Sequence, residues 1–215
     1  MAFATDADLL VLEPALFRDV AWIGQRLVSG TGSAGGTVLT MSTQDVAFDA
    51  AGVGAGNVVL INDAPFEVID RISGTVLTIS RLRTGSDEPL IPIGPVAGAG
   101  VSVPTFAPQI AMVHRQVMRM IGIDPDAQPD QARISASAIT NRPGIARLEA
   151  LGALHLIFSS AGSALGPESV FSKKAELYRQ RFAEERQRSA AMIDLDGDGQ
   201  PDAIRRFNIM LLVRG

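Results

Sequence analysis

The hydrophobic period of this sequence changes twice, and that change most constrains how the chain can fold. Apolar residues recur at spacings of three and four between Leu9 and Leu27, alternate with a period of two from Thr37 to Ile79, and return to helical spacing from Pro108. A period near 3.6 is typical of one helix face, and a period of two is typical of a half-buried strand. The sequence therefore predicts an α+β fold in which a β segment is inserted between helical parts.

The first two segments are predicted as an N-terminal helix, residues 1–30, and a small antiparallel β-barrel, residues 31–104. β-branched residues dominate the runs expected to be strands, which are 38–41, 57–61, 66–72 and 75–79. The run 29–36, SGTGSAGG, is predicted to be a flexible connector. It contains G-x-G-x-x-G, but a dinucleotide site needs a preceding strand and a following helix, and here that order is reversed. The stretch 82–104 is rich in Pro and Gly, which predicts a loop with at most one more strand, near 101–103.

Residues 105–190 are predicted to form a helical bundle. Gly122 is placed to stop its first helix, and Asn141 is placed to cap the second, with Pro143 in the first turn. This second helix is apolar on more than one side, which predicts a central buried helix. The last helix, 168–190, has an apolar stripe only in its first half, so its second half is expected to face water or a polar partner.

Composition excludes several function classes. The chain has no cysteine, which removes thiol nucleophiles, thiolate zinc sites and disulfides. Its 19 basic and 23 acidic residues give a net charge of -4, which disfavours a dedicated DNA-binding protein. The start, Met1 to Leu12, carries Asp6 and Asp8 and no early positive charge, and no apolar run approaches the roughly 18 residues of a membrane span. We expect a soluble chain without a membrane partner.

The histidines do not suggest catalysis. His114 and His155 are the only two, and neither has a second histidine four residues away, as a helical zinc site requires. His155 extends an apolar line with Leu148, Leu151 and Phe158, so we expect a core histidine bonded to a neighbouring carbonyl. Most acid–base and nucleophilic schemes then lack their parts, and the chain is predicted not to be an enzyme.

One dense carboxylate cluster lies near the C-terminus. Alternate aspartates in DLDGDGQPD resemble a calcium loop, and the candidate calcium ligands are Asp194, Asp196, Asp198 and Asp202. A full EF-hand is excluded because Arg205 stands at the twelfth position, where a bidentate Glu is needed. The alternative is a hairpin tip in which the Asp side chains bond to nearby backbone N–H groups. No cofactor is required, and calcium is the candidate.

The segment 191–215 combines this loop with a predicted docking arm. In an extended chain Phe207, Ile209, Leu211 and Val213 share one face, and four apolar residues on one face need a partner. The preceding helix carries six basic and three acidic residues between Ser172 and Arg188. We therefore expect partner contacts, to a portal or a neighbouring subunit, from these four apolar residues together with Arg179 and Arg186.

Over KAELYRQRFAEERQRSAAMIDLDGDGQPDAIRRFNIMLLVRG the order of parts resembles the head–tail adaptor (connector) proteins of tailed bacteriophages and gene-transfer particles. The resemblance covers helices that flank a small β insertion and a C-terminal arm. It implies a structural virion protein made in the host cytoplasm, which forms a homo-oligomeric ring in the virion neck, commonly of twelve subunits. Such a ring lies beneath the portal protein, receives the stopper or tail-terminator protein, and meets DNA only as passing cargo.

Two other hypotheses come from different classes. The first is a calcium-dependent binding module, in which the barrel recognises a ligand and the Asp loop stiffens a binding face. The second is a hydrolase that uses the Asp cluster and a divalent metal, although no general base stands at a recognisable spacing.

Overall fold

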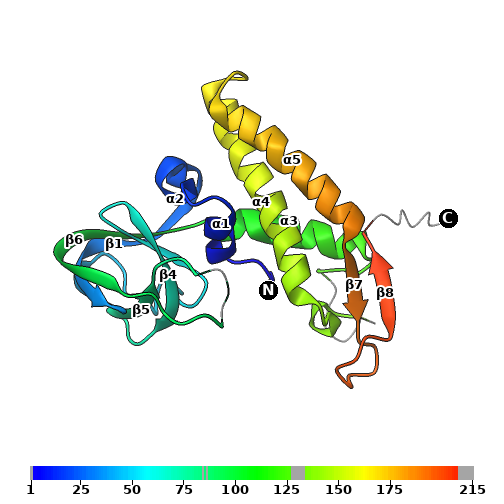
Figure 1. Cartoon of the computed structure of the whole chain (residues 1–215), viewed down its shortest axis with the longest axis horizontal. Coiled ribbons are helices and arrows are strands. Elements are labelled where there is room, and N and C mark those ends of the chain that lie inside the picture. Colours follow the sequence, from blue (N-terminus) through cyan, green and yellow to red (C-terminus); the bar gives the residue numbers. More distant parts are fainter. Residues whose placement is uncertain (1, 84, 86, 127–133, 208–215) are drawn as a thin grey trace. The chain divides into compact units, whose positions relative to one another are not determined.

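The computed structural model of the chain describes residues 2–83, 85, 87–126 and 134–207. Helices and strands both occur, so the predicted α+β class is confirmed, and its β part is a closed six-stranded antiparallel barrel (Figure 1). The chain divides into two compact units. Residues 5–107 make up the barrel unit, and the residues before Thr5 join those from Pro108 onward in a helical unit.

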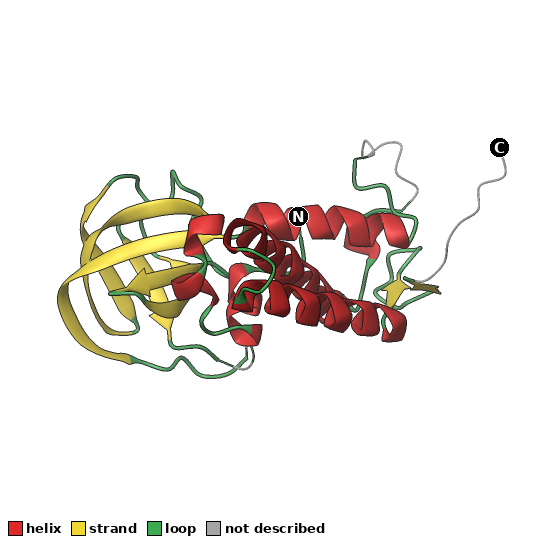
Figure 2. Cartoon of the chain, turned by 90° about the horizontal axis from the view of Figure 1, so that it is seen from above, coloured by secondary structure: helices red, strands yellow, loops and turns green. Residues whose placement is uncertain are grey.

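The barrel is built from strands that the change to a period of two largely predicts. In chain order these are β1 (Gln25–Gly36), β2 (Val38–Gln44), β3 (Val58–Ile61), β4 (Ala64–Arg71), β5 (Val76–Ser80) and β6 (Ile93–Thr105). Around the barrel, seen from a second side in Figure 2, the order is β1-β2-β5-β4-β3-β6, and β6 pairs with β1. Inward side chains of the strands, together with Phe48 and Val53 from the β2–β3 connection, form one apolar core.

The glycine-rich run predicted as a flexible connector is instead part of β1. A Cβ on Gly30 would lie 2.0 Å from the carbonyl oxygen of Thr43 in β2, and one on Gly32 would lie 2.7 Å from that of Thr40. Glycine here permits a close approach of two backbones, so it does not mark flexibility. The loop predicted over 82–104 is also wrong in large part, because β6 pairs with β1 along most of its length.

The single N-terminal helix predicted over residues 1–30 is wrong as well. The segment contains the short helices α1 (Asp6–Leu12) and α2 (Leu16–Asp19), the 3-10 turn η1 (Ala21–Ile23), and the start of β1. Pro14 follows α1, and proline disfavours helical conformation in the residue before it. From Thr5 onward the segment belongs to the barrel unit, where Leu9, Leu16 and Phe17 are buried, so residues 1–30 are no separate domain.

A buried aspartate ties α1 to the end of β6. Asp6 is 3% exposed, and its carboxylate accepts hydrogen bonds from Phe106 N–H (2.8 Å), the Thr105 hydroxyl (2.7 Å) and the Asn57 amide (3.2 Å). Burial raises the pKa of this carboxyl above its ordinary value, although all three donors favour the ionised form. The barrel unit therefore includes a desolvated acid held by three donors.

The helical unit contains the helices that the second change of period predicts. It is built from α3 (Ala107–Met120), the 3-10 turn η2 (Ala136–Ala138), α4 (Arg142–Leu165), α5 (Val170–Arg188), β7 (Ala190–Ile193) and β8 (Ala203–Arg206). Gly122 follows α3 with a φ of 72°, a left-handed conformation that favours glycine, so the predicted stop is confirmed.

The helix α4 is the buried helix of this unit, as predicted, with 12 of its 24 residues buried. The helix α5 packs along it (Figure 1). Two glycines of α4 permit close contact with neighbouring helices. A Cβ on Gly162 would lie 2.6 Å from Ser172 Oγ of α5, and one on Gly152 would lie 2.7 Å from Val113 Cγ1 of α3. Contrary to the sequence prediction, α4 has the length and hydropathy of a membrane span. However, 61% of that stretch is buried inside the protein, as in the core helix of a soluble protein.

Candidate functional site: the C-terminal sheet and its aspartate loop

A two-stranded antiparallel sheet, β7 with β8, follows directly after α5. Its register pairs Met192 with Ile204. One edge of β7 is held by the segment before α4, because Thr140 N–H donates to the Met192 carbonyl (2.9 Å) and Asp194 N–H donates to that of Ala138 (2.8 Å). The sheet is therefore anchored along β7.

Asn141 strengthens this anchor. It occupies the N-cap position of α4, as predicted, but its side chain makes no capping hydrogen bond. Instead its amide donates to the Ala190 carbonyl (2.8 Å), and its carbonyl accepts from Met192 N–H (2.9 Å). The predicted cap is thus a bridge between the start of α4 and β7.

The two faces of the sheet differ in exposure. On the inner face, Ala191 and Ile193 are fully buried, and Arg205 donates from Nη1 to the Ile121 carbonyl (2.7 Å). On the outer face, the cross-strand pair Met192 and Ile204 is 40% and 67% exposed. The outer face is therefore an apolar surface that the described part of the chain leaves open.

The loop between the strands is organised by its own aspartates. Asp194 accepts hydrogen bonds from the N–H groups of Gly197 (2.6 Å) and Gly199 (2.8 Å), which lower the pKa of its carboxyl. Asp198 accepts from the N–H of Gln200 at 2.7 Å. Gly197 and Gly199 have φ values of 83° and 86°, so both lie where glycine is favoured. These contacts match the hairpin-tip alternative.

Three of the four predicted calcium ligands lie together. Asp194, Asp196 and Asp202 each offer a carboxylate oxygen, and these oxygens lie within 4.8 Å of one another. Asp198 is not in this group, so its prediction as a fourth ligand is not supported by the geometry. Carboxylate oxygens are the ligands that calcium prefers, and the remaining trio could hold such a cation. The geometry leaves both alternatives, hairpin tip and calcium loop, chemically sound.

The predicted docking residues have different outcomes. Phe207 is 4% exposed, so its side chain is buried by its own chain and the prediction of an outward contact is wrong there. Ile209, Leu211 and Val213 lie outside the described residues. The alternation of apolar residues in the sequence assigns each residue to one of two strand faces. It does not say which face is buried, so it cannot show that Phe207 packs inward.

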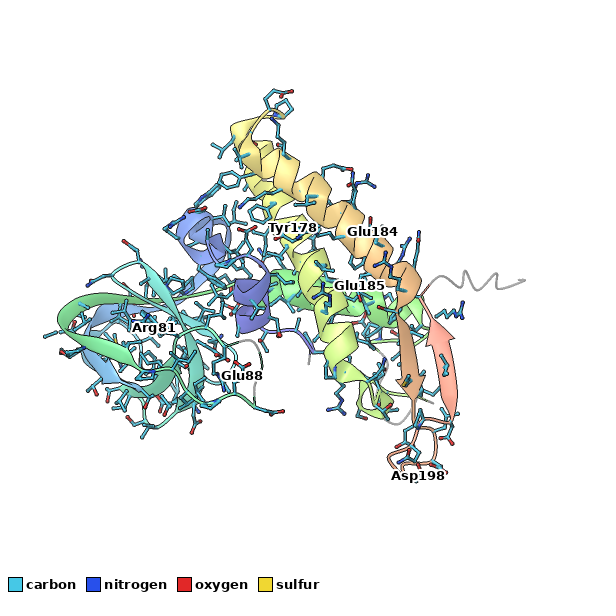
Figure 3. The ribbon with its side chains drawn as sticks, viewed as in Figure 1. Arg81, Glu88, Tyr178, Glu184, Glu185 and Asp198 are labelled. Carbon is cyan, nitrogen blue, oxygen red and sulfur yellow. The ribbon has the colours of Figure 1, made fainter. Side chains whose placement is uncertain are left out.

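The two predicted basic contacts also differ from each other. Arg179 is exposed and makes two 2.7 Å hydrogen bonds to Glu176, which lower the pKa of that carboxyl to about 2. Arg186 is half-buried, and its Nε is buried without a hydrogen-bond partner among the described residues. Figure 3 shows the same helix with Glu184 and Glu185 labelled in its second half. Arg179 is therefore the more accessible of the two cations.

His155 confirms the prediction of a core histidine bonded to a carbonyl. Its Nδ1 lies 3.0 Å from the Ala175 carbonyl oxygen and 3.3 Å from Ser159 Oγ. A carbonyl can only accept, so Nδ1 carries the proton and cannot accept one from Ser159. The Ser159–His155 pair, which lines a shallow surface groove, is therefore not an activated nucleophile.

A second buried acid went unnoticed in the sequence. Glu149 is fully buried, with one carboxylate oxygen 2.7 Å from His114 Nδ1. The other oxygen accepts from the N–H groups of Phe3 (2.9 Å) and Ala4 (3.0 Å). A carboxylate inside an otherwise apolar helical run is a signal that could have identified it. The cluster holds the N-terminal segment against α4, which is a structural role.

Comparison with protein-family models, with curated proteins and with solved structures finds no match for this chain. No residue role can therefore be transferred from a relative. The functional interpretation depends on the contacts described above and on the resemblance in the order of parts. Among these features the C-terminal sheet is the strongest, since it combines an exposed apolar face with an adjoining apolar sequence.

Proposed function

We propose that the chain is a non-enzymatic structural subunit of the virion neck, a head–tail adaptor made in the host cytoplasm. In this proposal it is a helical bundle with an inserted β-barrel and a C-terminal arm. Subunits form a ring, commonly of twelve, that binds the portal protein on one side and the stopper or tail-terminator protein on the other. DNA passes through the ring as cargo.

One observation carries the proposal. The outer face of the C-terminal sheet leaves Met192 and Ile204 exposed, and the sequence immediately after this sheet supplies Ile209, Leu211 and Val213. Exposed apolar surface that adjoins a further apolar segment is typical of a protein–protein contact. The accessible cation Arg179, and Arg186 nearer the sheet, supply polar contacts on the preceding helix. This arrangement suits a subunit that is completed by its neighbours.

The chemistry of the described residues also supports a structural role. The proton on His155 Nδ1 leaves Ser159 without a base, and His114 is bonded to the buried carboxylate of Glu149. Asp6 is likewise enclosed by donors of its own unit. The buried polar groups are thus used to hold segments together.

The test compares the full chain with a variant that ends at Phe207. Both are examined by light scattering and negative-stain imaging, alone and with the portal ring from the same genome. We expect the full chain to form rings or to bind the portal, and the shortened chain to remain folded without assembling, because Phe207 and β8 are retained. A full chain that stays monomeric and ignores the portal would contradict the proposal, whereas monomers that assemble only on the portal would support it.

A second candidate function uses the aspartate trio. We propose, as the alternative, a calcium-dependent binding module in which Asp194, Asp196 and Asp202 hold the cation and stiffen the C-terminal sheet; the observation that favours it is the 4.8 Å grouping of their oxygens. Calorimetric titration with calcium is the test. Binding that is accompanied by a large rise in melting temperature would favour this module, since a ligand of the native state stabilises it by mass action.

A further inference from the structure

Among the residues that the structure describes, the outer edge of β8 has no partner strand, and the hydrogen bonds of β7 show which backbone groups this edge presents. Both backbone groups of Met192 are used on the side away from β8, by Thr140 N–H and by the Asn141 side chain. Backbone groups alternate in direction along an antiparallel strand, so the groups of Ala191 and Ile193 face β8. Their register partners are Arg205 and Ala203. The N–H and C=O groups of the remaining β8 residues, Ile204 and Arg206, therefore point to the open side.

This edge is unpaired within the described residues, where the order of the sheet is β7-β8 alone. An open edge is a template for one more strand. The side chains beside it are apolar on the outer face, since Ile204 is 67% exposed and its partner Met192 is 40% exposed. A strand that presents an apolar residue opposite Ile204 would extend this face.

The segment that best fits this edge is in the chain itself, directly after Phe207. Residues 208–214 read NIMLLVR and contain neither glycine nor proline. A two-residue return onto the chain's own β8 favours positive φ at both central positions; Phe207 does not have a positive φ, and Asn208 is the one residue of 208–214 whose type commonly adopts it. The Phe207 side chain is also buried at 4% exposure, which fixes the point where the segment leaves. The sequence therefore favours an acceptor in another molecule.

We propose that residues 209–213 of one copy pair with the open edge of β8 in a second copy of this chain. Placing Leu211 opposite Ile204 also places Ile209 opposite Arg206. Ile204 and Arg206 are the two β8 residues whose backbone groups point away from β7. In this register Ile209, Leu211 and Val213 share the outer face with Ile204, because side chains alternate along a strand. Cross-strand apolar contacts and backbone hydrogen bonds then act together.

Charge determines the direction of the added strand. The chain of β8 runs away from the aspartate loop, from Ala203 to Arg206. In this register an antiparallel partner runs toward that loop, so Val213 stands opposite Asp202 and Arg214 stands opposite Pro201, within the segment that carries the three carboxylates. A parallel partner would instead place Arg214 opposite Phe207, next to the like charge of Arg206 and away from the carboxylates. Opposite charges on neighbouring strands are favourable and like charges are not, so the antiparallel direction is selected.

The inference extends the proposed function by naming the acceptor of the arm as a neighbouring subunit. A donor segment on one surface and an acceptor edge on another make a head-to-tail contact, which closes into a ring when the rotation between copies allows it. The portal could bind elsewhere, so the two proposals can fail independently. Strand exchange between copies would pair the edge of β8 that the described residues of a single chain leave unpaired.

Cysteine pairing tests this register directly, because the chain has no cysteine of its own. Two single variants, Ile204→Cys and Leu211→Cys, are mixed under mild oxidation. Hydrogen-bonded residues of an antiparallel pair have Cα atoms about 5.5 Å apart, inside the range of about 4.4–6.8 Å that a disulfide spans. The matched control replaces Leu211→Cys by Leu212→Cys, the same residue type one position along and on the opposite face.

We expect the Ile204→Cys and Leu211→Cys mixture to form a cross-linked dimer in at least about fivefold greater yield than the control mixture, because a one-residue shift turns the thiol to the other face. Arg214→Glu should lower that yield. Equal yields for positions 211 and 212, or no dimer at any attainable protein concentration, would overturn the inference.

A doubly substituted chain, Ile204→Cys with Leu211→Cys, is diluted into excess unmodified chain to detect pairing within one molecule. A cross-link that persists inside single chains, without dimers from the mixed single variants, would also overturn the inference. Portal binding without selective cross-linking would leave the proposed function intact and reject the strand exchange. Selective cross-linking without portal binding would do the reverse.

Discussion

Replacing Glu149 by alanine should destabilise the helical unit more than any other single loss of charge in it. The carboxylate is fully buried and joins three groups, which are His114 Nδ1, Phe3 N–H and Ala4 N–H, at 2.7 to 3.0 Å. Alanine would leave all three without this partner. A buried donor left unsatisfied costs about 1–3 kcal/mol, so the loss of a shared partner by three groups supports a total of about 3–5 kcal/mol.

We therefore expect Glu149→Ala to lower the free energy of unfolding by about 3–5 kcal/mol, which corresponds to a fall in melting temperature of about 10 °C for a chain of this size. Glu149→Gln keeps the shape and one acceptor, so its loss should be smaller, about 1–2 kcal/mol. Amide hydrogen exchange at Phe3 and Ala4 should accelerate in both variants, because the N-terminal segment loses its anchor.

Urea denaturation measures the free energy of unfolding of both Glu149 variants, with Glu184→Ala as the control. Glu184 is exposed on α5 (Figure 3), so its replacement should change stability by no more than about 0.5 kcal/mol. If Glu149→Ala and Glu184→Ala unfold at the same denaturant concentration, and exchange at Ala4 is unchanged, then the buried carboxylate is not the anchor that its contacts indicate.

Three further predictions concern the barrel and the aspartate loop. Burial raises the pKa of Asp6, so its contribution to stability is fully present below the unfolded-state pKa and is lost as pH rises through the folded-state pKa. Asp6→Asn should therefore reduce the fall in denaturation midpoint between acidic and neutral pH. An unchanged dependence of the midpoint on pH would contradict this prediction. Gly30→Ala should lower the free energy of unfolding by about 2–3 kcal/mol, because the new Cβ would meet the carbonyl oxygen of Thr43. Gly94→Ala is the control and should be near neutral, because a Cβ there meets open space. Equal melting temperatures for the two variants would refute the close approach of β1 and β2 at Gly30. If the loop binds calcium, Asp194→Asn should weaken the calorimetric affinity by at least about tenfold, and equal affinity would exclude the trio as the site.

Local pattern was sufficient for much of the fold. The spacing of apolar residues identified α3, α4 and α5 and the strands β2 to β5, because helix and strand periods depend on which side chains lie a few positions apart. The core role of His155 followed from the same spacing, and its bond to the Ala175 carbonyl agrees with it. The absence of cysteine likewise excluded thiol chemistry without any structure.

Contacts between distant parts of the chain determined the rest. The segment Ser29–Gly36 is a strand because β2 and β6 lie beside it, and its glycines suit a backbone approach that no local pattern records. Glu149 meets Ala4 across 145 residues, and Asp6 meets Phe106 across 100. The inward turn of Phe207 is of the same kind, because alternation divides a strand into two faces and only packing decides which is buried. Desolvation and close approach are properties of the assembled unit, so they appear only when distant backbones have been brought together.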